Sequence, residues 1–144
     1  MTFEDDLSFG EKIEREFLEI MLDHLEVEGI KVAGYHSAYD IESSDGVKYE
    51  IKSDRKCALT GNVFVEISCN GEASGLFVTE ADKIVYYLNN EWVFITPNSL
   101  HNLIADEEPR YWKGKPDGGS VVEGYIIPYE TFIEYSEMII QVEQ

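Results

Sequence analysis

The clearest hydrophobic pattern in the chain is an alternation with a period of two at residues 47–53. The apolar side chains are Val47, Tyr49 and Ile51, and the polar ones are Lys48, Glu50 and Lys52. Because successive side chains of a strand point to opposite faces, this pattern predicts a half-buried strand. A strand is also expected over residues 38–43, and the turn at Asp45-Gly46 joins the two as a hairpin. The hairpin should bring Asp40 alongside Glu50 and Lys52.

Helical spacing dominates residues 9–27, where apolar side chains recur every three or four positions. Ser8 could cap this helix, with Glu11 as its capping-box partner. Glu14 lies in line with the apolar stripe, and a carboxylate there is costly unless it is paired or coordinates a cation. Two interpretations stay open: Glu14 reaches a functional site, or it is solvated at the edge of the stripe. Glu11 is the alternative candidate for the functional carboxylate.

The remaining segments predict a mixture of strands and helices. Strands are expected at residues 30–35, 63–69, 84–88, 92–95 and 125–128. A helix should begin at Thr96-Pro97, since proline suits the first helical position. Residues 105–119 are charged and rich in glycine and proline, which indicates a flexible loop, and residues 129–142 do not choose between helix and strand. This order predicts one α+β (α/β) domain over residues 1–144, with a mixed central β-sheet flanked by helices.

Composition complicates any role in binding nucleic acid. The 144 residues include 29 acidic and 11 basic ones, and the net charge is −18, whereas proteins that bind phosphate backbones usually carry basic patches. The basic residues are clustered, one group being Lys48, Lys52, Arg55 and Lys56 and the other Arg110, Lys113 and Lys115. Three hypotheses follow: a nuclease with a local basic rim, a nuclease adapted to a salty cytoplasm, and an acidic protein that imitates DNA.

The same composition bears on location and redox state. No apolar run is long enough to span a bilayer, and the acidic start is unlike a signal peptide. We therefore expect a cytoplasmic protein without a membrane partner. Cys57 and Cys69 have no metal-site spacing, and we expect both to be free thiols.

Asp40, Glu50 and Lys52 together carry a recognisable chemistry. Two carboxylates supply the oxygen ligands that Mg²⁺ prefers, and a neighbouring lysine can position or help deprotonate a water. Clustered carboxylates also disfavour one another's ionisation unless they bind a cation. This set of residues is typical of metal-assisted phosphodiester hydrolysis.

The arrangement Asp40-(nine residues)-Glu50-Ile51-Lys52 resembles the PD-(D/E)xK nuclease superfamily. Segments over roughly residues 10–135 are similar to small phage-encoded members, among them residues 50–66, 73–75, 79–82 and 118–128. Tyr39 stands where the superfamily usually has proline. The resemblance implies a restriction-endonuclease-like core and DNA as the substrate.

The resemblance also implies roles for individual residues. Asp40, Glu50 and the main-chain carbonyl of Ile51 would bind Mg²⁺ (or Mn²⁺), Lys52 would be the catalytic lysine, and Glu14 would bind a second ion or orient a water. The expected substrate-binding residues are Lys48, Arg55, Lys56 and Ser74.

Several alternatives remain at this point. The same fold could serve a non-catalytic acidic inhibitor that binds a host or phage nucleic-acid-binding protein. Glu66 could support the site or pair with Lys56 or Arg55. Trp112, beside Arg110 and Tyr111, could stack on unpaired bases or could pack its loop onto the domain. Neither the kind of DNA cut nor the oligomeric state follows from the sequence.

Overall fold

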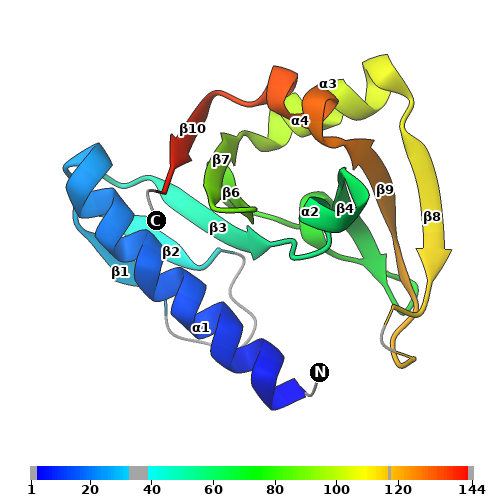
Figure 1. The fold of residues 1–144 in the computed structure, drawn as a ribbon, viewed down its shortest axis with the longest axis horizontal. Coiled ribbons are helices and arrows are strands. Elements are labelled where there is room, and N and C mark those ends of the chain that lie inside the picture. The colour runs from blue at the N-terminus through cyan, green and yellow to red at the C-terminus, as the bar shows by residue number, and fades with distance from the viewer. Residues whose placement is uncertain (1–2, 33–38, 117, 143–144) are drawn as a thin grey trace.

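A six-stranded mixed sheet forms the centre of the molecule (Figure 1). The computed structural model describes residues 3–32, 39–116 and 118–142. In spatial order the strands are β1 (Gly29–Lys31), β2 (Ile41–Ser43), β3 (Lys48–Ser53), β6 (Lys83–Leu88), β7 (Glu91–Ile95) and β10 (Met138–Gln141). Neighbouring strands are antiparallel except β3 and β6, which are parallel. The predicted hairpin is present as β2 and β3.

A second, antiparallel sheet lies beside the first and was not expected from the sequence. Its strands, in order, are β5 (Glu72–Ala73), β4 (Asn62–Cys69), β9 (Val122–Pro128) and β8 (Arg110–Gly114). The long connection between the parallel strands β3 and β6 contains β4, β5 and two short helices, α2 (Cys57–Thr60) and η2 (Gly75–Phe77). The crossover of the first sheet therefore supplies the first half of the second.

Helix α1 (Phe3–Ile20) covers one face of the first sheet. Its residue Phe17 is fully buried, with ring centroids 5.4 Å from Tyr49 of β3, 5.4 Å from Trp92 and 5.8 Å from Phe94 of β7. The chain continues as a π-helical segment, η1 (Met21–Leu25). The helix begins at Phe3, so Ser8 lies inside it and the predicted cap at Ser8 is wrong.

The opposite face of the first sheet packs against the second sheet and two helices, α3 (Pro97–Glu107) and α4 (Tyr129–Tyr135). Tyr86 of β6 meets Phe132 of α4 with ring centroids 4.9 Å apart. Thr96 caps α3 by accepting a hydrogen bond from the Ser99 amide at 3.1 Å, as the Thr-Pro pair predicts. With helices on both faces of a mixed sheet, the predicted α+β class is confirmed.

Two segments differ from the sequence expectations. The predicted flexible loop at residues 105–119 contains the end of α3 and the whole of β8. Residues 129–142 form both elements in turn, α4 and then β10, which pairs with β7. No helix in the described part of the chain is long and apolar enough to cross a membrane. Cys57 and Cys69 are both free thiols.

Candidate active site

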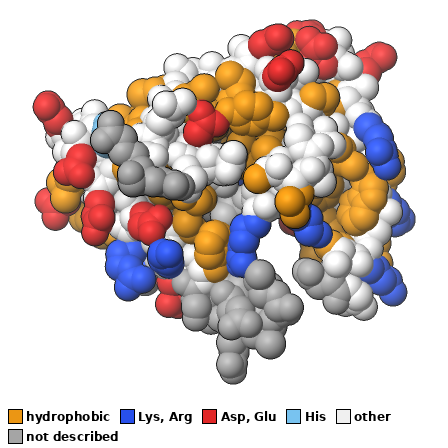
Figure 2. All heavy atoms as spheres, viewed as in Figure 1, with side chains coloured by type: hydrophobic (Ala, Val, Ile, Leu, Met, Phe, Trp, Pro, Cys, Tyr) orange, Lys and Arg blue, Asp and Glu red, His pale blue; other side chains and the backbone are white. Residues whose placement is uncertain are grey.

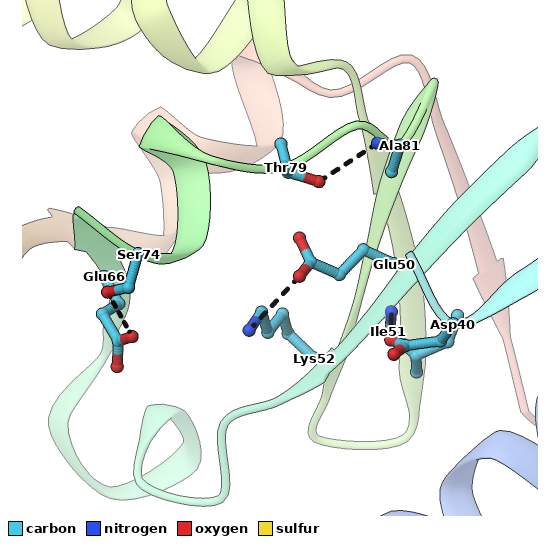
Figure 3. Close-up of polar contacts among 8 residues, drawn as sticks. All are labelled: Asp40, Glu50, Ile51, Lys52, Glu66, Ser74, Thr79 and Ala81. Atoms are coloured by element: carbon cyan, nitrogen blue, oxygen red, sulfur yellow. Dashed lines mark hydrogen bonds and ion pairs between the residues drawn. The ribbon is translucent and has the colours of Figure 1, made fainter. Parts of the chain in front are cut away.

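The hairpin brings the predicted acidic and basic residues together (Figure 3). Glu50 and Lys52 project from the same face of β3, and Lys52 Nζ lies 3.6 Å from Glu50 Oε1. Asp40 immediately precedes β2, where its amide donates to the Tyr49 carbonyl at 2.9 Å. Its carboxylate in turn accepts a hydrogen bond from the Ile51 amide at 2.7 Å. The predicted convergence of these residues is present in the structure.

The main chain of Ile51 contributes to the same corner. The N–H and C=O of one residue in a strand point toward the same neighbouring strand. Since the Ile51 amide donates to Asp40, the Ile51 carbonyl is directed to the side on which Asp40 lies. The course of the backbone therefore places the Ile51 carbonyl, one of the expected metal ligands, on the same side of β3 as Asp40.

Both carboxylates of the hairpin are held in an environment that disfavours their charge. Burial raises the pKa of Asp40, against the opposing effects of the Ile51 amide and the Lys52 ammonium. Burial likewise raises the pKa of Glu50, and the Asp40 carboxylate adds to this, although Lys52 and the Thr79 hydroxyl lower it. The Glu50 side chain is only 16% exposed. Its Oε2 atom is buried and makes no hydrogen bond of normal length among the described residues, although the Thr79 hydroxyl lies close enough to favour the charged carboxylate.

Glu14 approaches this group from the other face of the sheet. It lies on α1, which packs on the Tyr49 face of β3, whereas Glu50 and Lys52 occupy the opposite face. Glu14 forms an ion pair with Lys31, with 3.5 Å between Nζ and Oε2. Burial, and after it the Asp40 carboxylate, raises the pKa of Glu14. Glu14 is therefore coupled to the site through Asp40 and is already paired with Lys31.

The four expected substrate-binding residues do not all face the site. Lys56 lines a pocket next to Glu50 and Lys52. Lys48 sits over the Tyr39 ring, 5.0 Å from its centroid, and the Arg55 guanidinium stacks 3.7 Å from the centroid of the Phe9 ring on α1.

The Ser74 side chain is hydrogen-bonded within the protein. Its hydroxyl donates to Glu66 Oε2 at 2.7 Å. Glu66 therefore pairs with Ser74 in the described structure (Figure 3). The side chain of Ser74 is part of the support for a wall of the pocket, since Gly75 and Leu76 line that pocket and Ser74 does not.

A pocket of about 410 Å³ opens beside Glu50 and Lys52, between the two sheets. Figure 2 looks onto this side of the molecule, where Lys and Arg side chains lie on both sides of a hollow. Ile84 and Tyr86 of the first sheet line the pocket, and Phe64, Trp112 and Ile126 of the second sheet form the wall across from them. The sequence points to Trp112, beside Arg110 and Tyr111, but not to Phe64 or Tyr86. No local pattern marks those two, because the pairing of distant strands brings them here.

Asp54, a further carboxylate in the pocket lining, has a structural role. Its Oδ1 accepts from the amides of Lys56 and Cys57, each at 3.1 Å, and its Oδ2 accepts from the Phe64 amide at 3.0 Å. These bonds fix the turn that carries the chain from β3 into β4. Asp54 thus sets the position of the second sheet relative to Glu50 and Lys52.

The site contains oxygen atoms that could act as ligands of a metal ion. No group of three His, Cys, Asp or Glu side chains that could hold a metal ion is gathered in the described parts of the chain. Mg²⁺ is commonly bound by one or two carboxylates together with waters and substrate phosphates. Asp40, Glu50 and the Ile51 carbonyl are oxygen donors of this kind, and the Glu50 Oε2 atom makes no hydrogen bond of normal length among the described residues. The residues present therefore fit Mg²⁺.

Comparison with known proteins identifies no family for this chain. No protein-family model matches the chain, and no curated protein matches its sequence.

Proposed function

We propose that this protein is a Mg²⁺-dependent nuclease of the PD-(D/E)xK type that hydrolyses phosphodiester bonds of DNA. The observation that carries the proposal is the buried Glu50 Oε2, which makes no hydrogen bond of normal length in the described structure, although the Thr79 hydroxyl is near it. An acceptor of this kind is costly to bury unless a cation or donor completes it. It lies beside Asp40 and Lys52, which are the other two residues that the chemistry requires.

Asp40, Glu50 and the Ile51 carbonyl would hold the metal ion. When bound, Mg²⁺ would supply Lewis-acid stabilisation of the phosphate and an activated water. The Ile51 amide fixes the Asp40 carboxylate in place with its 2.7 Å hydrogen bond. The ligand set would thus be oriented by the hairpin backbone before the substrate arrives.

Lys52 is the proposed catalytic residue. Its side chain is 40% exposed, whereas that of its partner Glu50 is 16% exposed. The ammonium can therefore keep its contact with Glu50 while it faces a phosphate from the pocket side. In that position it would neutralise negative charge that develops on the phosphate, or assist the loss of a proton from the attacking water.

The acidic-inhibitor hypothesis explains the net charge of −18 but not the site. A protein that imitates DNA needs carboxylates displayed to its partner, such as the exposed Glu11, Glu19 and Asp23 of the N-terminal helical region. Asp40 and Glu50 are instead turned inward around a lysine. The arrangement of the site therefore favours the enzyme.

Substitution of Lys52 by alanine tests the proposal. We expect Lys52→Ala to lower the rate of plasmid and oligonucleotide cleavage with Mg²⁺ or Mn²⁺ by about 10²–10⁴-fold, the range for loss of one proton-transfer group. Lys12→Ala is the matched control, because it removes one positive charge from the exposed surface of α1. It should cut at the wild-type rate, and both variants should keep the wild-type circular dichroism spectrum.

Two outcomes would overturn the proposal. Cleavage by Lys52→Ala at the wild-type rate would remove Lys52 from the mechanism. Absence of cleavage of single-stranded, branched and duplex DNA with either metal would reject the nuclease. Capture of a basic DNA-binding protein, lost on neutralising Glu16, Glu19 and Asp23, would then support the inhibitor.

A further inference from the structure

The pocket wall that faces Glu50 and Lys52 is built from aromatic rings on the second sheet. Phe64 of β4 and Trp112 of β8 meet edge to face, with ring centroids 5.6 Å apart and an interplanar angle of 85°. The strand register places them on one face, because Phe64 pairs with Ile126 while Trp112 pairs with Gly124 on the intervening strand β9. Phe64, Trp112 and Ile126 all line the pocket.

Two glycines make room for these rings. A Cβ at Gly124 would lie 2.6 Å from the tip of the Phe64 ring and 2.3 Å from the Val65 carbonyl oxygen. A Cβ at Gly114 would lie 2.6 Å from the indole of Trp112. Each ring therefore rests against a bare stretch of backbone, which fixes its position in the wall. A wall held in this way is pre-organised to receive a flat ligand.

The size and charge of the pocket limit what that ligand can be. About 410 Å³ falls at the small end of the range for small-molecule sites, so the pocket admits one nucleotide and not a duplex. Lys52 and Lys56 lie in the same lining as the aromatic wall, together with the carboxylates of Glu50, Asp54 and Glu66. Asp54 accepts from three main-chain amides and Glu66 from the Ser74 hydroxyl. Cationic groups beside an apolar, aromatic recess match a nucleotide, whose phosphate is charged and whose base is flat.

We infer that this pocket takes one unpaired nucleobase of the strand that is cut, stacked against Trp112, while the adjacent phosphate lies at Glu50 and Lys52. The inference rests on the proposed nuclease function and specifies its substrate class as single-stranded or locally unpaired DNA. A paired base is shielded within its stack and must be extruded to enter such a pocket. The net charge of −18 also fits a substrate that is gripped over few phosphates, since each extra phosphate needs a cation.

The first experiment measures binding without metal, in EDTA, so that no cleavage is required. Intrinsic fluorescence is a direct readout because the only tryptophans are Trp92, which is fully buried in the core under α1, and Trp112. Six-nucleotide oligothymidylate should quench the signal and bind at least tenfold more tightly than a six-nucleotide strand of equal charge that lacks all its bases. A blunt duplex of the same sequence should bind no better than the strand without bases. Equal affinity for the strands with and without bases would overturn the inference.

A pair of variants adds a residue-level test. By fluorescence anisotropy of a labelled strand, Trp112→Ala should weaken oligothymidylate binding about 5- to 150-fold, the loss expected for one base–aromatic stack. Tyr111→Ala is the control, because Tyr111 lies on the opposite face of β8, against Tyr125. Equal affinities of the two variants would contradict the proposed stacking. The comparison of strands on the wild-type protein stands even if Trp112→Ala does not fold.

The two proposals fail in different ways. Base-dependent binding without any cleavage in Mg²⁺ would retain the pocket and reject the nuclease. Cleavage of single strands at the same rate with and without their bases would retain the nuclease and reject the pocket.

Discussion

Glu50 combines two properties at the scale of a single residue: one of its oxygens lies 3.6 Å from the Lys52 ammonium, and the other is buried without a hydrogen bond of normal length among the described residues. Burial raises its pKa and that of Asp40. Without a metal ion, ionisation of these carboxylates is therefore less favourable in the folded protein than in the unfolded chain. Carboxylates with perturbed pKa values of this kind are frequent at functional sites.

The first prediction at this scale concerns stability without metal. Glu50→Gln should raise the melting temperature in EDTA by a few degrees, because about 1 kcal/mol shifts Tm by roughly 2–4 °C in a chain of this size. Glu72→Gln, which removes the same charge from an exposed position, is the control. Differential scanning calorimetry at pH 7.5 would measure both. A lower Tm for Glu50→Gln than for the control would show that the carboxylate stabilises the fold.

The direction of the pH effect follows from the same pKa shifts. Because the folded-state pKa values of Asp40 and Glu50 are raised, the folded protein holds these protons to higher pH than the unfolded chain. Their contribution to stability is complete below the unfolded pKa, about 4, and is lost as the pH rises through the folded values. The advantage of Glu50→Gln over wild type should therefore shrink as the pH is lowered toward 4.

At the scale of elements, the part of the site within one hairpin was predictable and the rest was not. The alternation around Glu50 fixes which side chains share a face, and the short turn fixes their distance from Asp40. Strand β8 was not predicted because it is an edge strand in which no residue is fully buried. Its exposed Tyr111 is an aromatic residue next to Trp112, so the sequence shows no alternation of apolar and polar residues there. The place of β8 is set by pairing with β9.

The C-terminal segment shows the same limit. Residues 129–142 carry apolar side chains at spacings that suit both a helix and a strand. In the structure, Phe132 of α4 is buried in the core between the two sheets, and Ile140 of β10 is buried in the core under α1. Likewise, one sheet was predicted where two are present, since β4 looks like any central strand by sequence. Only the pairing of β4 with β9 separates it from the first sheet.

An element-scale prediction concerns the glycine under the Phe64 ring. Gly124→Ala should destabilise the fold by about 1–3 kcal/mol, the usual effect of overpacking, because its Cβ would collide with backbone at Val65 as well as with Phe64. Gly119→Ala is the control, since a Cβ there has nothing within 4 Å. Urea denaturation would compare the two variants, and equal midpoints would show that the second sheet can shift to accept the methyl group.

At the scale of the whole molecule, the net charge of −18 acts on stability through self-repulsion. Added NaCl should raise Tm by screening this repulsion. Mg²⁺ at the same ionic strength should raise it further, because an ion bound only by the native state stabilises that state by mass action.

Asp40→Asn separates the two effects of Mg²⁺. The variant should keep the response to NaCl and lose most of the additional response to Mg²⁺, because it removes one of the two proposed carboxylate ligands. Thermal scans at matched ionic strength would measure both responses. The same additional shift in wild type and variant would mean that Mg²⁺ acts by general screening.

The crossover between β3 and β6 has an evolutionary consequence. The hairpin that spaces Asp40, Glu50 and Lys52 is closed before the crossover begins, and the pocket wall is contributed by β4 inside it and by β8 and β9 further along the chain. Insertions or exchanges in these later segments can reshape the pocket while the hairpin keeps its spacing. Descendants of this chain could thus diverge in the molecules they accept while inheriting the same three polar residues unchanged.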